Sequence, residues 1–87
     1  MAHKLTMSDT KNLEGHLRQL FSQPYGIVDL SIYGNSHIRP HDFEVTQFNC
    51  GKPLNEQHYT VRFNDKVLGE NLSFDKMIST ITENIYT

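Results

Sequence analysis

Apolar residues near the start of the chain recur with the spacing of an amphipathic helix. Four of them stand at i, i+4, i+7 and i+8, which places them on one face of a helix: Leu13, Leu17, Leu20 and Phe21. Pro24 disfavours helical backbone at the residue before it. The pattern predicts a helix over residues 9–22. Residues 1–7 lack this spacing, and we expect them to form a flexible tail, or else an edge segment.

Alternation of apolar and polar residues takes over after this helix. In the run 27–33, Val28, Leu30 and Ile32 point to one side, as in a half-buried strand. Residues 43–48 and 59–63 show similar patterns and predict two further strands. A tight turn at residues 64–65 then leads to a short strand over 66–68, and residues 69–71 turn the chain again.

The last part of the chain returns to helical spacing. Ser73 is a good N-cap, and a stripe of apolar residues follows it: Phe74, Met77, Ile78, Ile81 and Ile85. The elements predict an α+β fold in the order α-β-β-β(-β)-α. We expect one antiparallel sheet, with both helices packed on one face, in a single domain spanning residues 1–87.

The alternation also divides the sheet into a buried and an exposed side. Residues expected beneath the helices are Val28, Leu30, Ile32, Val45, Tyr59, Val61 and Phe63. Candidates for the opposite side are Ile27, Tyr33, Phe48 and Arg62. Tyrosine and arginine are enriched at protein interfaces, so the predicted binding surface comprises residues on this side or near element ends: Tyr25, Tyr33, Arg39, Phe48, Arg62 and Tyr86.

Length and charge exclude several classes of protein. The chain has 87 residues, too few for a catalytic domain with a separate substrate domain. Eight Lys and Arg against ten Asp and Glu give a net charge of -2, which indicates neither a strongly basic nucleic-acid binder nor an acidic mimic. With one cysteine, no signal-peptide pattern and no long apolar run, we expect a cytoplasmic protein with no membrane association.

Residues that could carry chemistry show no diagnostic spacing. His37, His41, Cys50 and His58 are of types that zinc prefers, but Pro40 lies between the first two histidines. No Cys-x-x-Cys or His-Glu-x-x-His spacing occurs. The acidic residues Asp29, Asp42, Glu44 and Asp65 fall on different elements, where we expect them to face solvent. We therefore predict no catalytic residues, no metal and no cofactor.

One stretch resembles a known family. Residues 58–69, followed by Ser73 and Lys76, are similar to the last hairpin and second-helix start of the double-stranded-RNA-binding domain. The resemblance covers about a third of the chain and implies an RNA-binding module. At the positions where that family has a lysine pair, this chain has Phe74 and Asp75.

Three functions are compatible with these features. The first is a non-catalytic module that binds a larger protein and acts as an inhibitor or adaptor, similar in size and element order to small phage-encoded inhibitors. The second is a nucleic-acid-binding module of the double-stranded-RNA-binding type. The third is a small metal-binding or thiol enzyme. The sequence leaves the partner and the choice between monomer and homodimer open.

Overall fold

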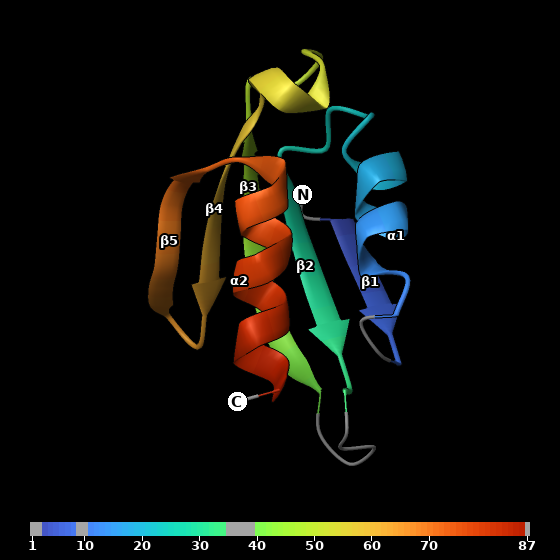
Figure 1. Ribbon diagram of the computed structural model, residues 1–87, viewed down its shortest axis with the longest axis vertical. Coiled ribbons are helices and arrows are strands. Elements are labelled where there is room, and N and C mark those ends of the chain that lie inside the picture. The colour runs from blue at the N-terminus through green and yellow to red at the C-terminus, as the bar shows by residue number, and fades with distance from the viewer. Residues whose placement is uncertain (1–2, 9–10, 35–39, 87) are drawn as a thin grey trace.

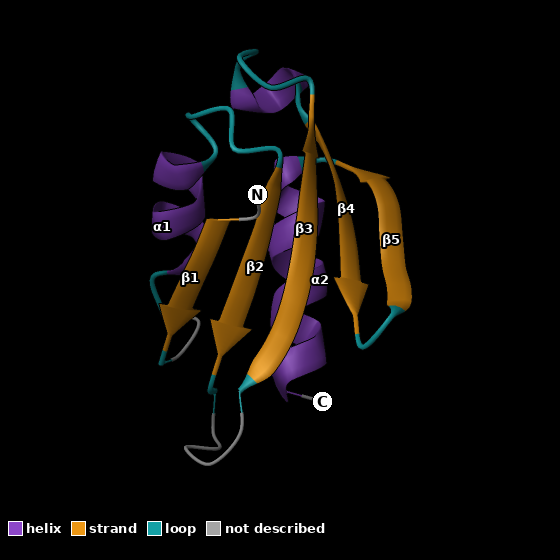
Figure 2. Ribbon diagram, turned by 180° about the vertical axis from the view of Figure 1, so that it is seen from behind, coloured by secondary structure: helices purple, strands orange, loops and turns teal. Residues whose placement is uncertain are grey.

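A computed structural model describes residues 3–8, 11–34 and 40–86. Its elements are β1 (His3–Met7), α1 (Leu13–Leu20), β2 (Ile27–Ile32), β3 (His41–Phe48), the short 3-10 helix η1 (Leu54–Glu56), β4 (His58–Phe63), β5 (Lys66–Leu72) and α2 (Phe74–Tyr86). The five strands form one sheet in the order β1-β2-β3-β4-β5. Both helices lie on the same face of it (Figures 1 and 2), which confirms the predicted α+β class and layer arrangement.

His3–Met7 form a strand at the edge of the sheet, which is the second of the two arrangements that we expected for the N-terminal segment, and not a flexible tail. Strand β1 pairs in parallel with β2, with Leu5 opposite Leu30 and Met7 opposite Ile32. Leu5 and Met7 pack against the core from the helix side. Helix α1 is the crossover between the two parallel strands (Figure 1). The sheet is therefore mixed, with an antiparallel part from β2 to β5.

Helix α1 is shorter than the predicted range 9–22. It begins at Leu13, after Asn12 at the N-cap position, and ends at Leu20. Residues 9 and 10, which were expected inside the helix, fall outside the described residues. The predicted face is correct: Leu13, Leu17 and Phe21 are buried, and Leu20 packs at the edge of the core.

The core fills the space between the sheet and the two helices. From the sheet it takes the inward apolar residues of β2, β3 and β4. The fully buried ones are Val28, Leu30, Ile32, Phe43, Val45, Tyr59 and Val61. All but Phe43 were expected there, whereas Phe63, also expected beneath the helices, is only partly buried against the core. Helix α2 contributes the stripe Phe74, Met77, Ile81 and Ile85. The backbone N–H of Lys76 donates to Oγ of Ser73, so Ser73 caps this helix as expected. Neither helix in the described part of the chain is long and apolar enough to cross a membrane.

The last hairpin is longer than predicted. Asn64 and Asp65 both have positive φ, 50° and 66°, as the two-residue turn of a hairpin requires. Strand β5 then continues to Leu72, through the residues 69–71 that we expected to turn. Register shifts opposite β4 interrupt the alternation here, and Asn71 has a φ of 55°. Because an irregular strand position favours the same residue types as a turn, this part of β5 was predicted as a turn.

The element order also differs from that of the RNA-binding domain that the hairpin resembles. That fold consists of a helix, three strands and a helix, whereas here β1 precedes the first helix and five strands form the sheet. Phe74 stands at one of the positions of the family's lysine pair, and its side chain is buried.

Candidate functional site: the open face of the sheet

The face of the sheet opposite the helices is covered by no helix of the described chain, and we call it the open face (Figure 2). Its side chains come from alternate positions of all five strands: Lys4, Thr6, Ile27, Asp29, Ser31, Asp42, Glu44, Thr46, Phe48, His58, Thr60, Arg62 and Val67. Three large apolar residues on this face are exposed, namely Ile27 (42%), Phe48 (49%) and Val67 (45%).

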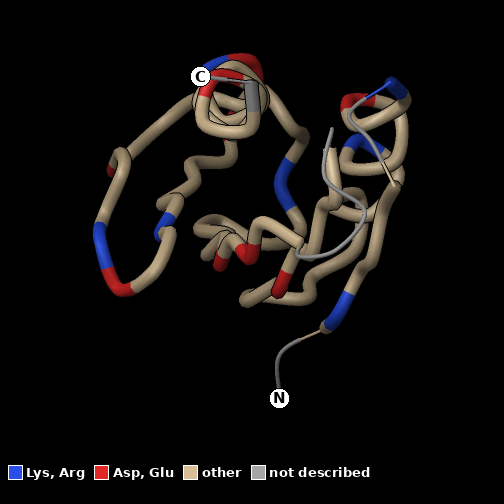
Figure 3. The backbone as a smooth tube through the Cα atoms, turned by 90° about the horizontal axis from the view of Figure 1, so that it is seen from below, with Lys and Arg blue, Asp and Glu red and all other residues tan. Residues whose placement is uncertain are grey.

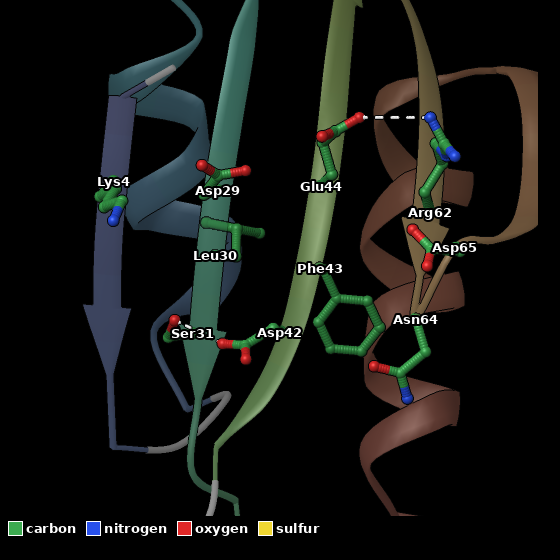
Figure 4. A pocket seen from close by; sticks show the side chains of 10 residues that line it. All are labelled: Lys4, Asp29, Leu30, Ser31, Asp42, Phe43, Glu44, Arg62, Asn64 and Asp65. Carbon is green, nitrogen blue, oxygen red and sulfur yellow. Dashed lines mark hydrogen bonds and ion pairs between the residues drawn. The ribbon is translucent and has the colours of Figure 1, made fainter. Parts of the chain in front are cut away.

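A row of charged residues crosses the middle of the open face. The strand register places Lys4 opposite Asp29, Asp29 opposite Glu44, and Glu44 opposite Arg62. An Arg62 guanidinium nitrogen lies 3.8 Å from Oε1 of Glu44 (Figure 4). Asp29 and Glu44, by contrast, are like charges on directly paired positions, an arrangement that lowers sheet stability.

A hollow of about 510 Å³ lies over this row (Figure 4). Its charged lining consists of four carboxylates and two basic side chains: Asp29, Asp42, Glu44, Asp65, Lys4 and Arg62. The Asp42 carboxylate also accepts a hydrogen bond of 2.7 Å from Oγ of Ser31. The hollow is therefore polar and predominantly acidic. We expected these four acidic residues to be separate groups facing solvent, and the pairing of β2, β3 and β4 brings them together.

Two buried glutamines form hydrogen bonds that fix the backbone at one end of the open face. Oε1 of Gln47 accepts from the backbone N–H of Gly26, and its Nε2 donates to the carbonyl of Phe21 and to Oε1 of Gln57. Gly26 directly precedes Ile27, and Gln47 directly precedes Phe48. The glutamine pair thus fixes the backbone next to Ile27 on β2 and next to Phe48 on β3.

Gln57 extends this network into the β3–β4 connection. Its Nε2 donates to the carbonyls of Phe21 and Lys52, at 3.1 and 2.7 Å, and its Oε1 accepts from the Tyr59 hydroxyl at 2.6 Å. Both glutamines are almost completely buried. Sequence reasoning missed them because a glutamine in an alternating strand, such as Gln47, or in a connection, such as Gln57, is typical of a residue that faces solvent.

Burial of the Tyr59 hydroxyl, with a smaller contribution from nearby Cys50, raises its pKa from 10.0 to about 12. The folded state therefore resists ionisation that the unfolded chain undergoes at lower pH. We expect stability to be fully present below pH 10 and to fall by about 1–3 kcal/mol as the pH rises towards 12. Denaturant unfolding of the parent and of Tyr59→Phe across this range tests the prediction. An equal loss in both proteins would contradict it.

The residues predicted as a binding surface only partly share one surface. Phe48 and Arg62 both lie on the open face. Tyr25 is exposed, but its ring stacks on His3 at 4.4 Å, beside the start of β1 rather than on the open face. Tyr33 is half-buried just after β2, where its N–H donates to the carbonyl of Met7. Two further predictions fall outside the described residues and side chains: Arg39, and the side chain of Tyr86 at the end of α2.

The histidines and the cysteine are dispersed. His41 stacks on Phe63, His58 is exposed opposite Phe48, and the exposed Cys50 donates from Sγ to the carbonyl of Gln47 at 3.5 Å. His37 lies outside the described residues. Across residues 3–8, 11–34 and 40–86, no three His, Cys, Asp or Glu side chains are placed to hold a metal ion.

No protein-family model, curated protein or solved structure matches this chain. The functional interpretation therefore rests on the open face itself.

Proposed function

We propose that this domain is a non-catalytic protein-binding module that acts as an inhibitor or adaptor by occupying a surface of a larger partner. The observation that carries the proposal is the open face with its exposed Ile27, Phe48 and Val67. A sheet face that only meets water is normally polar. Large apolar side chains beside charged ones, on a face that no described helix covers, are typical of protein interfaces.

The charge distribution favours a protein over a nucleic acid as the partner. Basic residues of the described chain are spread over separate elements rather than gathered in a stripe (Figure 3). The two on the open face are neighbours of carboxylates, Lys4 of Asp29 and Arg62 of Glu44. Phosphate binding needs clustered positive charge, which supports ranking RNA binding second.

Two finer parts of the proposal rest on the sequence. The small size and lack of catalytic motifs are typical of phage-encoded inhibitors of host systems, and we propose this role for the domain. A single cysteine needs no oxidising compartment, so we expect the partner to be in the cytoplasm.

Replacing Phe48 by lysine is expected to reduce partner capture at least about tenfold, because exposed aromatic residues carry much of the binding free energy at interfaces. The tagged protein and Phe48→Lys would be used to capture partners from the native host's lysate, with and without nuclease, and the bound proteins quantified by mass spectrometry. Ser79→Lys, which places the same side chain on an exposed position of α2, is the matched control. It should capture the same nuclease-resistant partner as the parent.

Equal capture by the parent and Phe48→Lys would show that the open face is not the binding surface. Partners that disappear on nuclease treatment would move the RNA-binding alternative to first place. Circular dichroism of both variants confirms that each retains the fold.

A further inference from the structure

The charges on the open face follow an order that restricts what can dock there. Along the central row, four consecutive strands present Lys4, Asp29, Glu44 and Arg62, so that the signs run plus, minus, minus, plus. Each basic residue has one carboxylate neighbour. The two carboxylates in the middle face each other without a basic residue between them.

The surroundings of this central pair add further negative charge. Asp42 lies on β3, two positions from Glu44, and Asp65 lies at the turn between β4 and β5; both line the same hollow. Burying such carboxylates under a neutral partner would remove their hydration without replacing it, which is costly. A partner that supplies cationic side chains avoids this cost, and a guanidinium can bond to two carboxylate oxygens at once.

The same order of charges disfavours a second copy of the chain as the occupant. If two open faces stack with their charged rows superposed about a two-fold axis centred on the row, the axis runs either along the row or along the strands. In the first case each residue meets itself, and in the second Asp29 meets Glu44 while Lys4 meets Arg62. Both cases oppose like charges, which disfavours association.

We infer that the partner is a different protein that presents lysine or arginine side chains to the acidic hollow and apolar side chains to Ile27 and Phe48. This inference rests on the proposed function and specifies the chemistry of the partner for the same face. The positive charges of the partner complement the four carboxylates of the hollow. Its apolar side chains cover residues that are now exposed to water.

The test uses the full chain, labelled with nitrogen-15, and a short synthetic peptide that alternates arginine with leucine. A second peptide has glutamate in place of arginine. We expect the arginine peptide to shift amide signals of β2 and β3 saturably, with an affinity that falls as salt is raised. Replacing both central carboxylates, Asp29→Asn with Glu44→Gln, should weaken this binding at least about tenfold.

The matched control removes two carboxylates elsewhere. Asp75→Asn with Glu83→Gln changes exposed residues of α2 and should bind the arginine peptide as the parent does. All four replaced carboxylates are on the surface, and thermal unfolding confirms that both double variants fold. Comparing the two therefore separates the charge of the open face from the net charge of the chain.

Several results would overturn the inference. One such result is that the glutamate peptide binds as well as the arginine peptide. Another is that the arginine peptide still binds after Asp29 and Glu44 are replaced. Either would show that the open face does not select cationic groups, although shifts on β2 and β3 would still support the proposed docking face. Concentration-dependent shifts there without peptide would make a second copy the occupant. Shifts confined to the helices would contradict both proposals. If neither peptide binds, the inference is also overturned. The proposed function is decided independently, by the lysate comparison with Phe48→Lys.

Discussion

Replacing Phe21 by alanine is expected to remove much of the stability of this fold. Phe21 follows α1 directly and is fully buried, with its ring centroid 5.0 Å from that of Tyr59. Removing a buried phenyl ring costs about 3–5 kcal/mol through lost burial and the cavity left behind. A domain of this size has about 4–13 kcal/mol in total. Thermal unfolding should therefore shift down by about 15–30 °C.

Phe48→Ala is the matched control for this prediction, because it deletes the same ring from the open face, where Phe48 is half exposed. We expect it to change the free energy of unfolding by less than about 1 kcal/mol. Phe21→Leu retains most of the buried volume and should fall between the two alanine variants, which keeps the comparison measurable even if Phe21→Ala does not fold. A similar loss in both alanine variants would contradict the assignment of Phe21 to the core and Phe48 to the surface.

The separation of these two phenylalanines could be predicted from the sequence because it follows from periodicity. Phe21 completes the helical stripe with Leu13 and Leu17. Phe48 lies on the opposite parity to Val45 in its strand. Both periods follow from backbone geometry, so wherever a helix or strand is regular, the pattern identifies its buried side. The same reasoning placed Ile27 and Arg62 correctly on the open face.

Prediction from the sequence was least successful where the structure depends on pairing between distant segments. Strand β1 is five residues long, and only Leu5 and Met7 carry its alternation. It joins β2 through a helical crossover, so no hairpin turn indicates it. Strand β5 contains residue types that are common in turns. The strand accommodates them through register shifts opposite Val61 and a positive φ at Asn71.

The acidic hollow was missed for the same reason. Asp29, Glu44 and Asp65 are far apart in the sequence, and each alone is typical of a solvent-facing position. They become neighbours only once the strand register is known. A prediction that paired Val28 with Val45 would have placed Asp29 opposite Glu44 as well. The available signal was therefore the register of the β2–β3 pair, which periodicity alone does not fix.

Replacing Gln57 by leucine is expected to affect both stability and binding, although this residue does not lie on the open face. The change removes four hydrogen bonds and leaves the buried Tyr59 hydroxyl and the Lys52 carbonyl without their partners. Leaving buried polar groups unsatisfied should lower the free energy of unfolding by about 2–4 kcal/mol. Thermal unfolding should shift down by about 10–20 °C.

The effect on binding would follow from the contact of Gln57 with Gln47, which holds the backbone beside Ile27 and Phe48. We expect Gln57→Leu to weaken partner capture below the unfolding temperature, with changed amide shifts at Ile27 and Phe48. Asn55→Leu makes a comparable change at an exposed position of the same connection and should alter neither property. Loss of stability with unchanged capture would show that the open face keeps its shape without the network, and that the two glutamines serve the fold alone.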